Sequence, residues 1–439
     1  MKKHLLLAAF ALLSCSLQAQ MNPKLQAALD ADAAAIQQKT IEWRRIFHQY
    51  PELSNMEVKT GARIAEFLKG LGLDVTTGVA RTGVVGLLRT GKPGPVVALR
   101  ADMDALPVEE RNDLPFASKE KTIYNDRETP VMHACGHDSH MAILMAVAEI
   151  LVKRKSELKG TVKFIFQPAE EGAGTTLGGA ELMVREGVLE NPKVDAIFGL
   201  HIQSTVPAGT INYRAGSLMA APDFFSIKVK GKGAHGATPW DGIDPLVVGA
   251  QIVMGIQTII SRQLEITREP AVITVGKFSA GNRENIIAEY AEMGGTIRTF
   301  DKKMQQQVHD KLRATAMNIA ESAGATAEVT ITSGSPVTYN DPALTNRMVP
   351  SLERAAGKTN ALSVSPVTMA EDFSVFQEKV PGLFFFIGGM KPGTDPKSAP
   401  IHHTPQFMLD ESGFVTGVRA LLNLTVDYLS SDPKIPSKK

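Results

Sequence analysis

The chain has 439 residues, of which 44% are hydrophobic, and its 47 Lys and Arg against 46 Asp and Glu give a formal net charge of +1. Such a balance offers no basic surface for a nucleic acid, and the length exceeds what one hydrophobic core usually organises. We therefore expect a globular protein of two domains that does not bind nucleic acid.

The N-terminus has the pattern of a bacterial export signal. Two lysines precede an uncharged run, Leu5–Leu13, and Ala19 ends a suitable cleavage site. We expect residues 1–19 to be removed and the protein to be periplasmic or secreted; lipidation of Cys15 is the alternative, since the residues before it partly resemble a lipoprotein box. No later run is long and apolar enough for a transmembrane helix, which requires roughly twenty residues.

Strands and helices alternate in the first half of the mature chain. Helical spacing and β-rich runs predict helices over 24–48, 57–71 and 139–153 and strands over 84–88 and 95–100. The runs 161–166 and 194–200 are continuously apolar, as in strands buried on both faces of a parallel sheet. These patterns predict an α/β domain with a mainly parallel sheet sandwiched by helices.

The pattern changes near residue 220. The segments that follow predict strand, helix, strand, strand, helix and strand over 223–230, 245–262, 271–278, 292–299, 302–322 and 326–332. This βαββαβ order is typical of a ferredoxin-like domain, which we place at 220–333. The first domain would then comprise 20–219 and 334–439, with a strand near 382–386 and a closing helix near 411–429.

Polar residues with metal-binding chemistry follow the predicted strands. A thiol and two imidazoles lie within Met132–Asp138, just before a helix, and the acid pair Glu170-Glu171 follows about thirty residues later. Because ligands gather at the carboxyl ends of strands in open α/β sheets, His201 and Asp104 should converge there too. Such ligands suit a divalent transition metal, and a spare acid can transfer protons, so the sequence predicts a metal-dependent hydrolase.

Each group also has a purely structural interpretation. Cys135 and His137 could be a buried thiol and a helix-capping histidine, and Glu170-Glu171 could be solvated loop acids. A lone histidine at the end of an apolar strand, such as His201, is often a satisfied core residue. The residues alone leave these alternatives open.

Eight different motifs follow one another along the chain: Pro51–Ser54, Arg100–Pro107, Met132–Asp138, Gln167–Glu171, Gly233–Gly236, Gly295–Arg298, Glu371–Phe373 and His402–His403. With them, nearly the whole mature chain resembles the zinc-peptidase-like M20 amidohydrolases. The similarity is to the subgroup that cleaves N-acyl amino acids, which includes hippurate hydrolase and plant auxin-conjugate hydrolases. The resemblance implies hydrolysis of an amide bond that releases a carboxylic acid and a free amino acid.

The resemblance also implies roles for individual residues. The metal ligands would be Cys135, His137, Glu171, His201 and His402, with the thiolate bridging two divalent ions, which could be zinc, manganese, cobalt or nickel. Glu170 would be the general base that deprotonates a metal-activated water, and Asp104 would orient a ligand or the base.

In the inserted domain, the resemblance implies that His235 steadies the tetrahedral intermediate, reaching the partner subunit's site in a homodimer. Asn285 and Arg298 are candidates for binding the substrate carboxylate. Surface positions are the alternative for His235 and Arg298. Two other functions are open: a dipeptidase or carboxypeptidase of the same superfamily, and a non-catalytic exported binding protein, which an intact Glu170 disfavours.

Overall fold

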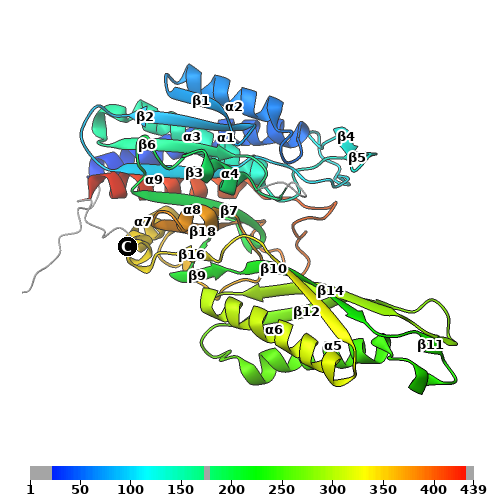
Figure 1. Cartoon of the computed structure of the whole chain (residues 1–439). Coiled ribbons are helices and arrows are strands. Elements are labelled where there is room, and N and C mark those ends of the chain that lie inside the picture. The colour runs from blue at the N-terminus through cyan, green and yellow to red at the C-terminus, as the bar shows by residue number, and fades with distance from the viewer. Residues whose placement is uncertain (1–21, 173–177, 432–439) are drawn as a thin grey trace, which may run out of the picture.

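An eight-stranded sheet forms the centre of the larger domain in the computed structural model, which describes residues 22–172 and 178–431 (Figure 1). The strand order is β1-β2-β6-β3-β7-β18-β8-β17. The strands are β1 (Asp74–Val79), β2 (Gly83–Arg89), β3 (Val96–Asp102), β6 (Thr161–Gln167), β7 (Ala196–Pro207), β8 (Ile211–Tyr213), β17 (Ala361–Ser363) and β18 (Gly382–Met390). The expected export signal and Cys15 lie outside the described residues.

The middle of this sheet is parallel: β6 with β3, β3 with β7 and β7 with β18. Strand β6 and the first half of β7 are almost entirely buried, as their continuous apolar runs predict. The edge strand β1 pairs antiparallel with β2, and β2 pairs antiparallel with β6. The expectation of a mainly parallel α/β sheet is confirmed.

Helices cover both faces of the sheet. One face carries α1 (Pro23–Gln49), α2 (Val58–Gly70), α3 (His137–Lys153), α7 (Pro342–Ala356) and α9 (Phe414–Ser430). The other carries the short helices α4 (Gly179–Arg185) and α8 (Phe373–Gln377). Successive residues of the central strands point to opposite cores: Leu99 and Phe198 face the first group, and Ala98 and Ile197 the second. A hairpin, β4 (Lys121–Tyr124) and β5 (Arg127–Pro130), projects from this domain.

The inserted domain has the predicted βαββαβ order. Its antiparallel sheet has the order β12-β14-β10-β15, made of β10 (Ala221–Lys230), β12 (Ala271–Ala280), β14 (Tyr290–Thr299) and β15 (Thr326–Ser333). Helices α5 (Pro245–Gln263) and α6 (Lys302–Ser322) pack together against one face (Figure 1). By length and composition α5 could cross a membrane, but its Val248, Ile252 and Ile256 are buried in the domain core.

Two short strands join the domains. β9 (Gly216–Met219) leads into the inserted domain and β16 (Thr338–Asn340) leads out, and the two pair antiparallel. At the far tip of the inserted domain, β11 (Ala234–His235) pairs with β13 (Ile286–Ile287) (Figure 1).

Candidate metal centre

The segment that carries Cys135 and His137 is fixed by a tight turn at Gly136. Gly136 has a φ of 95° and directly precedes α3, and a Cβ there would lie 2.5 Å from Cγ2 of Ile202. Only glycine therefore fits this turn without a shift of its neighbours. The turn places Cys135 just outside the helix and His137 at its first residue, and both are buried.

Four segments distant in sequence bring their donor atoms together. The Sγ of Cys135 lies 3.4 Å from Nε2 of His201 and 3.3 Å from Nε2 of His403. Oε1 of Glu171 lies 3.2 Å from Nε2 of His403 and 3.9 Å from Nε2 of His137. Donor atoms this close match the small ligand groups that hold transition metals in proteins. We call these five residues the metal centre.

Hydrogen bonds fix which nitrogen of two of these histidines is free to bind a metal. Nδ1 of His137 donates to the carbonyl oxygen of Asp104 (2.8 Å), and Nδ1 of His201 donates to that of Ile202 (2.7 Å). A carbonyl can only accept, so in each neutral ring Nδ1 carries the proton and Nε2 keeps a lone pair. Both Nε2 atoms face the centre.

The structure places His403, not the expected His402, in this group. Nε2 of His402 donates to the carbonyl of Ile202 (2.9 Å), and its Nδ1 lies 3.5 Å from the hydroxyl of Ser204. His403 instead has a left-handed backbone, with a φ of 62°, and its N–H donates to the carbonyl of Ala134. That conformation turns its ring toward Cys135. The adjacent histidines are equivalent in the sequence, and only the backbone distinguishes them.

The acid pair follows β6, and a second carboxylate holds it. The backbone N–H of Glu171 donates to Oδ2 of Asp104 (3.0 Å), which also accepts from the hydroxyl of Ser54 (2.7 Å). Asp104 therefore contacts both His137 and the backbone of the acid pair, consistent with an orienting role. Oε2 of Glu170 lies 4.0 Å from Nε2 of His137, beside the metal centre.

His201 lies within a strand and not after it, because β7 extends to Pro207. The ladder between β3 and β7 ends at Arg100 and Gly199, so the following part of β7 has no β3 neighbour. His201 therefore stands where the sheet opens, as expected for a ligand site at the carboxyl ends of parallel strands.

Negative groups crowd this site. Burial and the nearby Glu371 raise the pKa of Glu170 well above its usual range, and burial together with Glu171 raises that of the Cys135 thiol. Although burial lowers it, Asp102 and Asp104 raise the pKa of His137 to about 10. These shifts reflect acids packed together in a poorly solvated place.

The donor set fits a divalent cation. Among the described residues, buried Nε2 of His137 and Oε1 of Glu171 lack a hydrogen-bond partner, although unsatisfied buried polar atoms are costly. A cation would satisfy both atoms and offset the repulsion between the carboxylates. A thiolate, imidazoles and a carboxylate are ligands that zinc and its neighbours accept.

Two neighbouring polar residues are already occupied. His140 donates from Nδ1 to Asp102 (2.6 Å), and its Nε2 accepts the N–H of Ile202 (2.9 Å), so neither nitrogen is free for a metal. Arg100 is buried and pairs with Asp102, Glu371 and Asp372 at 2.7–2.9 Å. This arginine balances the acids behind Glu170.

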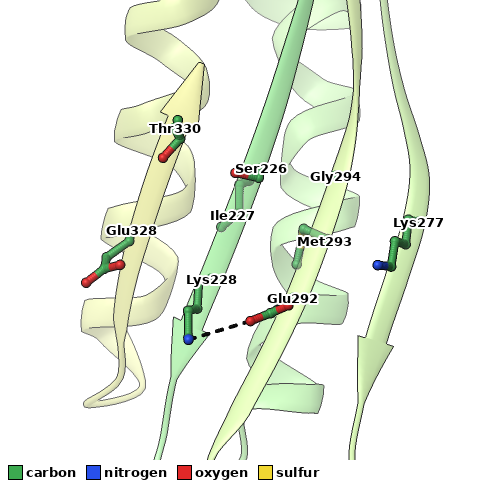
Figure 2. Close-up of a pocket in the computed structure, with 9 residues that line it drawn as sticks. All are labelled: Ser226, Ile227, Lys228, Lys277, Glu292, Met293, Gly294, Glu328 and Thr330. Atoms are coloured by element: carbon green, nitrogen blue, oxygen red, sulfur yellow. Dashed lines mark ion pairs between the residues drawn. The ribbon is translucent and has the colours of Figure 1, made fainter. Parts of the chain in front are cut away.

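The candidate residues of the inserted domain lie apart from the metal centre. Within residues 22–172 and 178–431, no hydrogen bond or ion pair joins His235, Asn285 or Arg298 to it. His235 and Asn285 are exposed near the tip of the domain, and Arg298 is half-buried on β14. A hollow of about 350 Å³ on the open sheet face, crossed by the Lys228–Glu292 ion pair (Figure 2), contains none of these three residues.

The family model for peptidase family M20/M25/M40 matches residues 98–427. The chain belongs to this family. Membership agrees with the metal centre, whose five residues all lie within the matched range, and makes the protein a metal-dependent hydrolase of the M20 family.

Several relatives that match almost the full length of this M20 protein are named for related hydrolytic reactions. The chain is 41% identical to thermostable carboxypeptidase 1 of Saccharolobus solfataricus, over 91% of this chain and 98% of the relative. It is 38% identical to an N-acetylcysteine deacetylase of Bacillus subtilis, over 90% and 98% of the two chains. The crystal structure of B. subtilis YxeP, a dinuclear metal-binding M20 peptidase, superposes with a TM-score of 0.75 at 36% identity, covering 91% of this chain and all of YxeP.

Proposed function

We propose that this M20 enzyme hydrolyses the amide bond of N-acyl amino acids, releasing a carboxylic acid and a free amino acid. One observation carries the proposal: Glu170 lies beside the metal centre with 11% of its side chain exposed, and no cationic side chain among the described residues hydrogen-bonds to it. A protein that only binds its ligand has no need for an acid in that position.

We assign Cys135, His137, Glu171, His201 and His403 as the ligands of two divalent ions. The dinuclear relative YxeP supports the number, and the mixed sulfur, nitrogen and oxygen donors allow zinc, manganese, cobalt or nickel. When bound, such ions polarise a carbonyl and lower the pKa of water toward neutrality.

Glu170 transfers the proton. It takes a proton from the attacking water as the water oxygen bonds to the amide carbon, and it returns that proton to the nitrogen as the carbon–nitrogen bond breaks. A base must begin the cycle deprotonated. The cations that the centre is built to hold, with Arg100 behind, favour the charged form of Glu170.

The inserted domain would complete the substrate site. In this proposal Arg298 and Asn285 bind the carboxylate of the amino acid, and His235 of a second copy steadies the negative oxygen of the intermediate. His235 lies at the exposed tip, where a partner subunit can approach it, and α5 exposes Leu246, Val247 and Met254. Export to the periplasm or the medium is part of the same proposal and rests on residues 1–19.

A substrate panel on metal-reconstituted protein tests the function. We expect benzoyl-glycine and N-acetyl amino acids to be cleaved faster than glycyl-dipeptides. The reverse order would favour the dipeptidase or carboxypeptidase alternative, which the carboxypeptidase relative keeps open. Tight binding of benzoyl-glycine without products would favour the binding protein.

A further inference from the structure

The acid pair depends on one unusual backbone conformation. Ala169, directly before Glu170, has a φ of 50°, in the left-handed region that residues with a Cβ disfavour. Ala169 is also completely buried. Something in the surroundings must therefore hold this residue in place, because its own preference is for another conformation.

A buried carboxylate holds Ala169. Oε1 of Glu57 accepts the backbone N–H of Ala169 (2.9 Å), and Oε2 accepts the hydroxyl of Thr82 (2.7 Å). On the other side, the carbonyl of Ala169 accepts the N–H of Gly179 (3.1 Å). Glu57 itself is fully buried, so these bonds form without competition from water.

The side chain of Glu57 is available for this contact because another acid, Glu52, caps helix α2. Glu57 is the N-cap residue of α2, yet its side chain makes no cap hydrogen bond. Glu52 caps the helix instead, accepting the N–H groups of Lys59 (3.2 Å) and Thr60 (2.8 Å). The side chain of Glu57 therefore takes no part in capping α2 and points into the core, where it binds the N–H of Ala169.

We propose that Glu57 is a positioning residue: its carboxylate holds the left-handed Ala169 that aims Glu170 and Glu171 into the metal centre. The proposal rests on the function proposed above for these two acids. Glu57 acts on the loop from the α2 side, and Asp104 acts on it two residues later through the N–H of Glu171. The acid pair is thus held by backbone bonds on both sides.

The test compares Glu57→Ala with Glu57→Gln. The amide oxygen of Gln can still accept from Ala169, and the Thr82 hydroxyl can accept from its NH₂ group, so Gln keeps the contact without the charge. We expect kcat for benzoyl-glycine to fall about tenfold to a hundredfold in Glu57→Ala, with KM little changed, and to stay near wild type in Glu57→Gln. Equal losses in both variants, or none in Glu57→Ala, would overturn the proposal.

A second substitution isolates the backbone conformation. Glycine adopts a positive φ without cost, so in an Ala169→Gly background the further loss caused by Glu57→Ala should be smaller. An undiminished loss would contradict the role assigned to Ala169. Glu52→Gln is the matched control. It should weaken the cap of α2 and lower the melting temperature, but it should leave kcat unchanged.

Metal binding separates this proposal from the proposed reaction. Glu171 follows Ala169 by two residues, so Glu57→Ala should also weaken Mn²⁺ binding to the metal-free protein, by about tenfold, and Glu57→Gln should not. If wild-type protein cleaves none of the panel but Glu57→Ala binds Mn²⁺ more weakly than Glu57→Gln, the proposed reaction is wrong and the positioning role stands. If the panel is cleaved and both variants bind Mn²⁺ and turn over like wild type, the positioning role is wrong.

Discussion

Two buried polar clusters meet at the start of α3, and their charges are arranged in opposite ways. His137 faces the metal centre, where Glu170, Glu171 and Cys135 crowd together. The next residue, Asp138, faces the other way. It pairs with Nε of Arg44 (2.9 Å) and with Nδ1 of His48 (2.7 Å).

In the second cluster each acid has a cationic partner. His48 continues it from Nε2 to Glu110 (3.1 Å), so cations and anions alternate along the chain of contacts. Although burial alone would raise it, Arg44 and His48 hold the pKa of Asp138 well below its usual range, whereas the pKa of Glu170 lies well above. Removing one partner from such a buried, matched set leaves an unpaired charge and destabilises the fold. Like charges left together at the metal centre create a site for a cation.

The largest effect should come from Glu170→Gln. Removing the base should lower kcat for the preferred substrate by about a hundredfold to ten-thousandfold. The melting temperature should stay equal or rise, because one acid is removed from a crowded group. Steady-state kinetics and thermal melts measure both, with exposed Glu66→Gln on α2 as the control. Undiminished turnover would refute the assignment.

Breaking the matched cluster should affect stability instead. Arg44→Met leaves the buried Asp138 and His48 without their cation, which should cost about 3–5 kcal/mol of unfolding free energy. Arg45→Met is the control, since its half-exposed guanidinium pairs with Glu411 at the surface and should contribute under about 1 kcal/mol. Urea unfolding distinguishes them, and similar losses would show that the buried cluster contributes no more to stability than a surface ion pair.

The adjacent histidines should differ in metal binding. His403→Ala removes a proposed ligand and should weaken Mn²⁺ or Zn²⁺ affinity by at least about tenfold. His402→Ala breaks contacts with Ile202 and Ser204 and should change the affinity little. Titration of chelator-treated protein measures both affinities. A larger loss in His402→Ala would restore the original expectation from the sequence.

The smallest effect concerns pH. Burial and Arg44 lower the pKa of His48, but Asp138 and Glu110 raise it more, so it lies above the usual 6.5. Stability from the charged ring is therefore complete below pH 6.5 and is lost as the pH rises through the raised value. Unfolding free energies measured across neutral and alkaline pH should fall in wild type and vary less in His48→Gln. An equal slope in both proteins would show that another group is responsible.

The sequence predicts the central elements well because buried strands and helices have apolar residues in recognisable runs or at helical spacing. The continuous apolar runs of β6 and β7 predict strands covered on both faces, and α1 follows its helical spacing almost to the residue. Helix α7 has no such signal, since Pro350 interrupts it and reads as a helix breaker. The β4–β5 hairpin is polar and exposed, so no apolar alternation marks it.

Site residues are predictable by type and less so by position. The Cys135–His137 spacing and the Glu170-Glu171 pair indicate metal chemistry, and the family resemblance favours it over their structural interpretations. The difference between His402 and His403 depends on the φ of 62° at His403 and on the carbonyl of Ile202, which the His402 ring meets. Glu57 gives no signal either, because its partner Ala169 becomes its neighbour only after folding.

The paired strands β9 and β16 have a mechanical consequence. Both covalent links between the domains are hydrogen-bonded to each other, with Thr338 opposite Met219, so neither link can lengthen or slide alone. Any displacement of the inserted domain must therefore move both links together. Substitutions that break this pairing should let the two links move separately while leaving each domain intact.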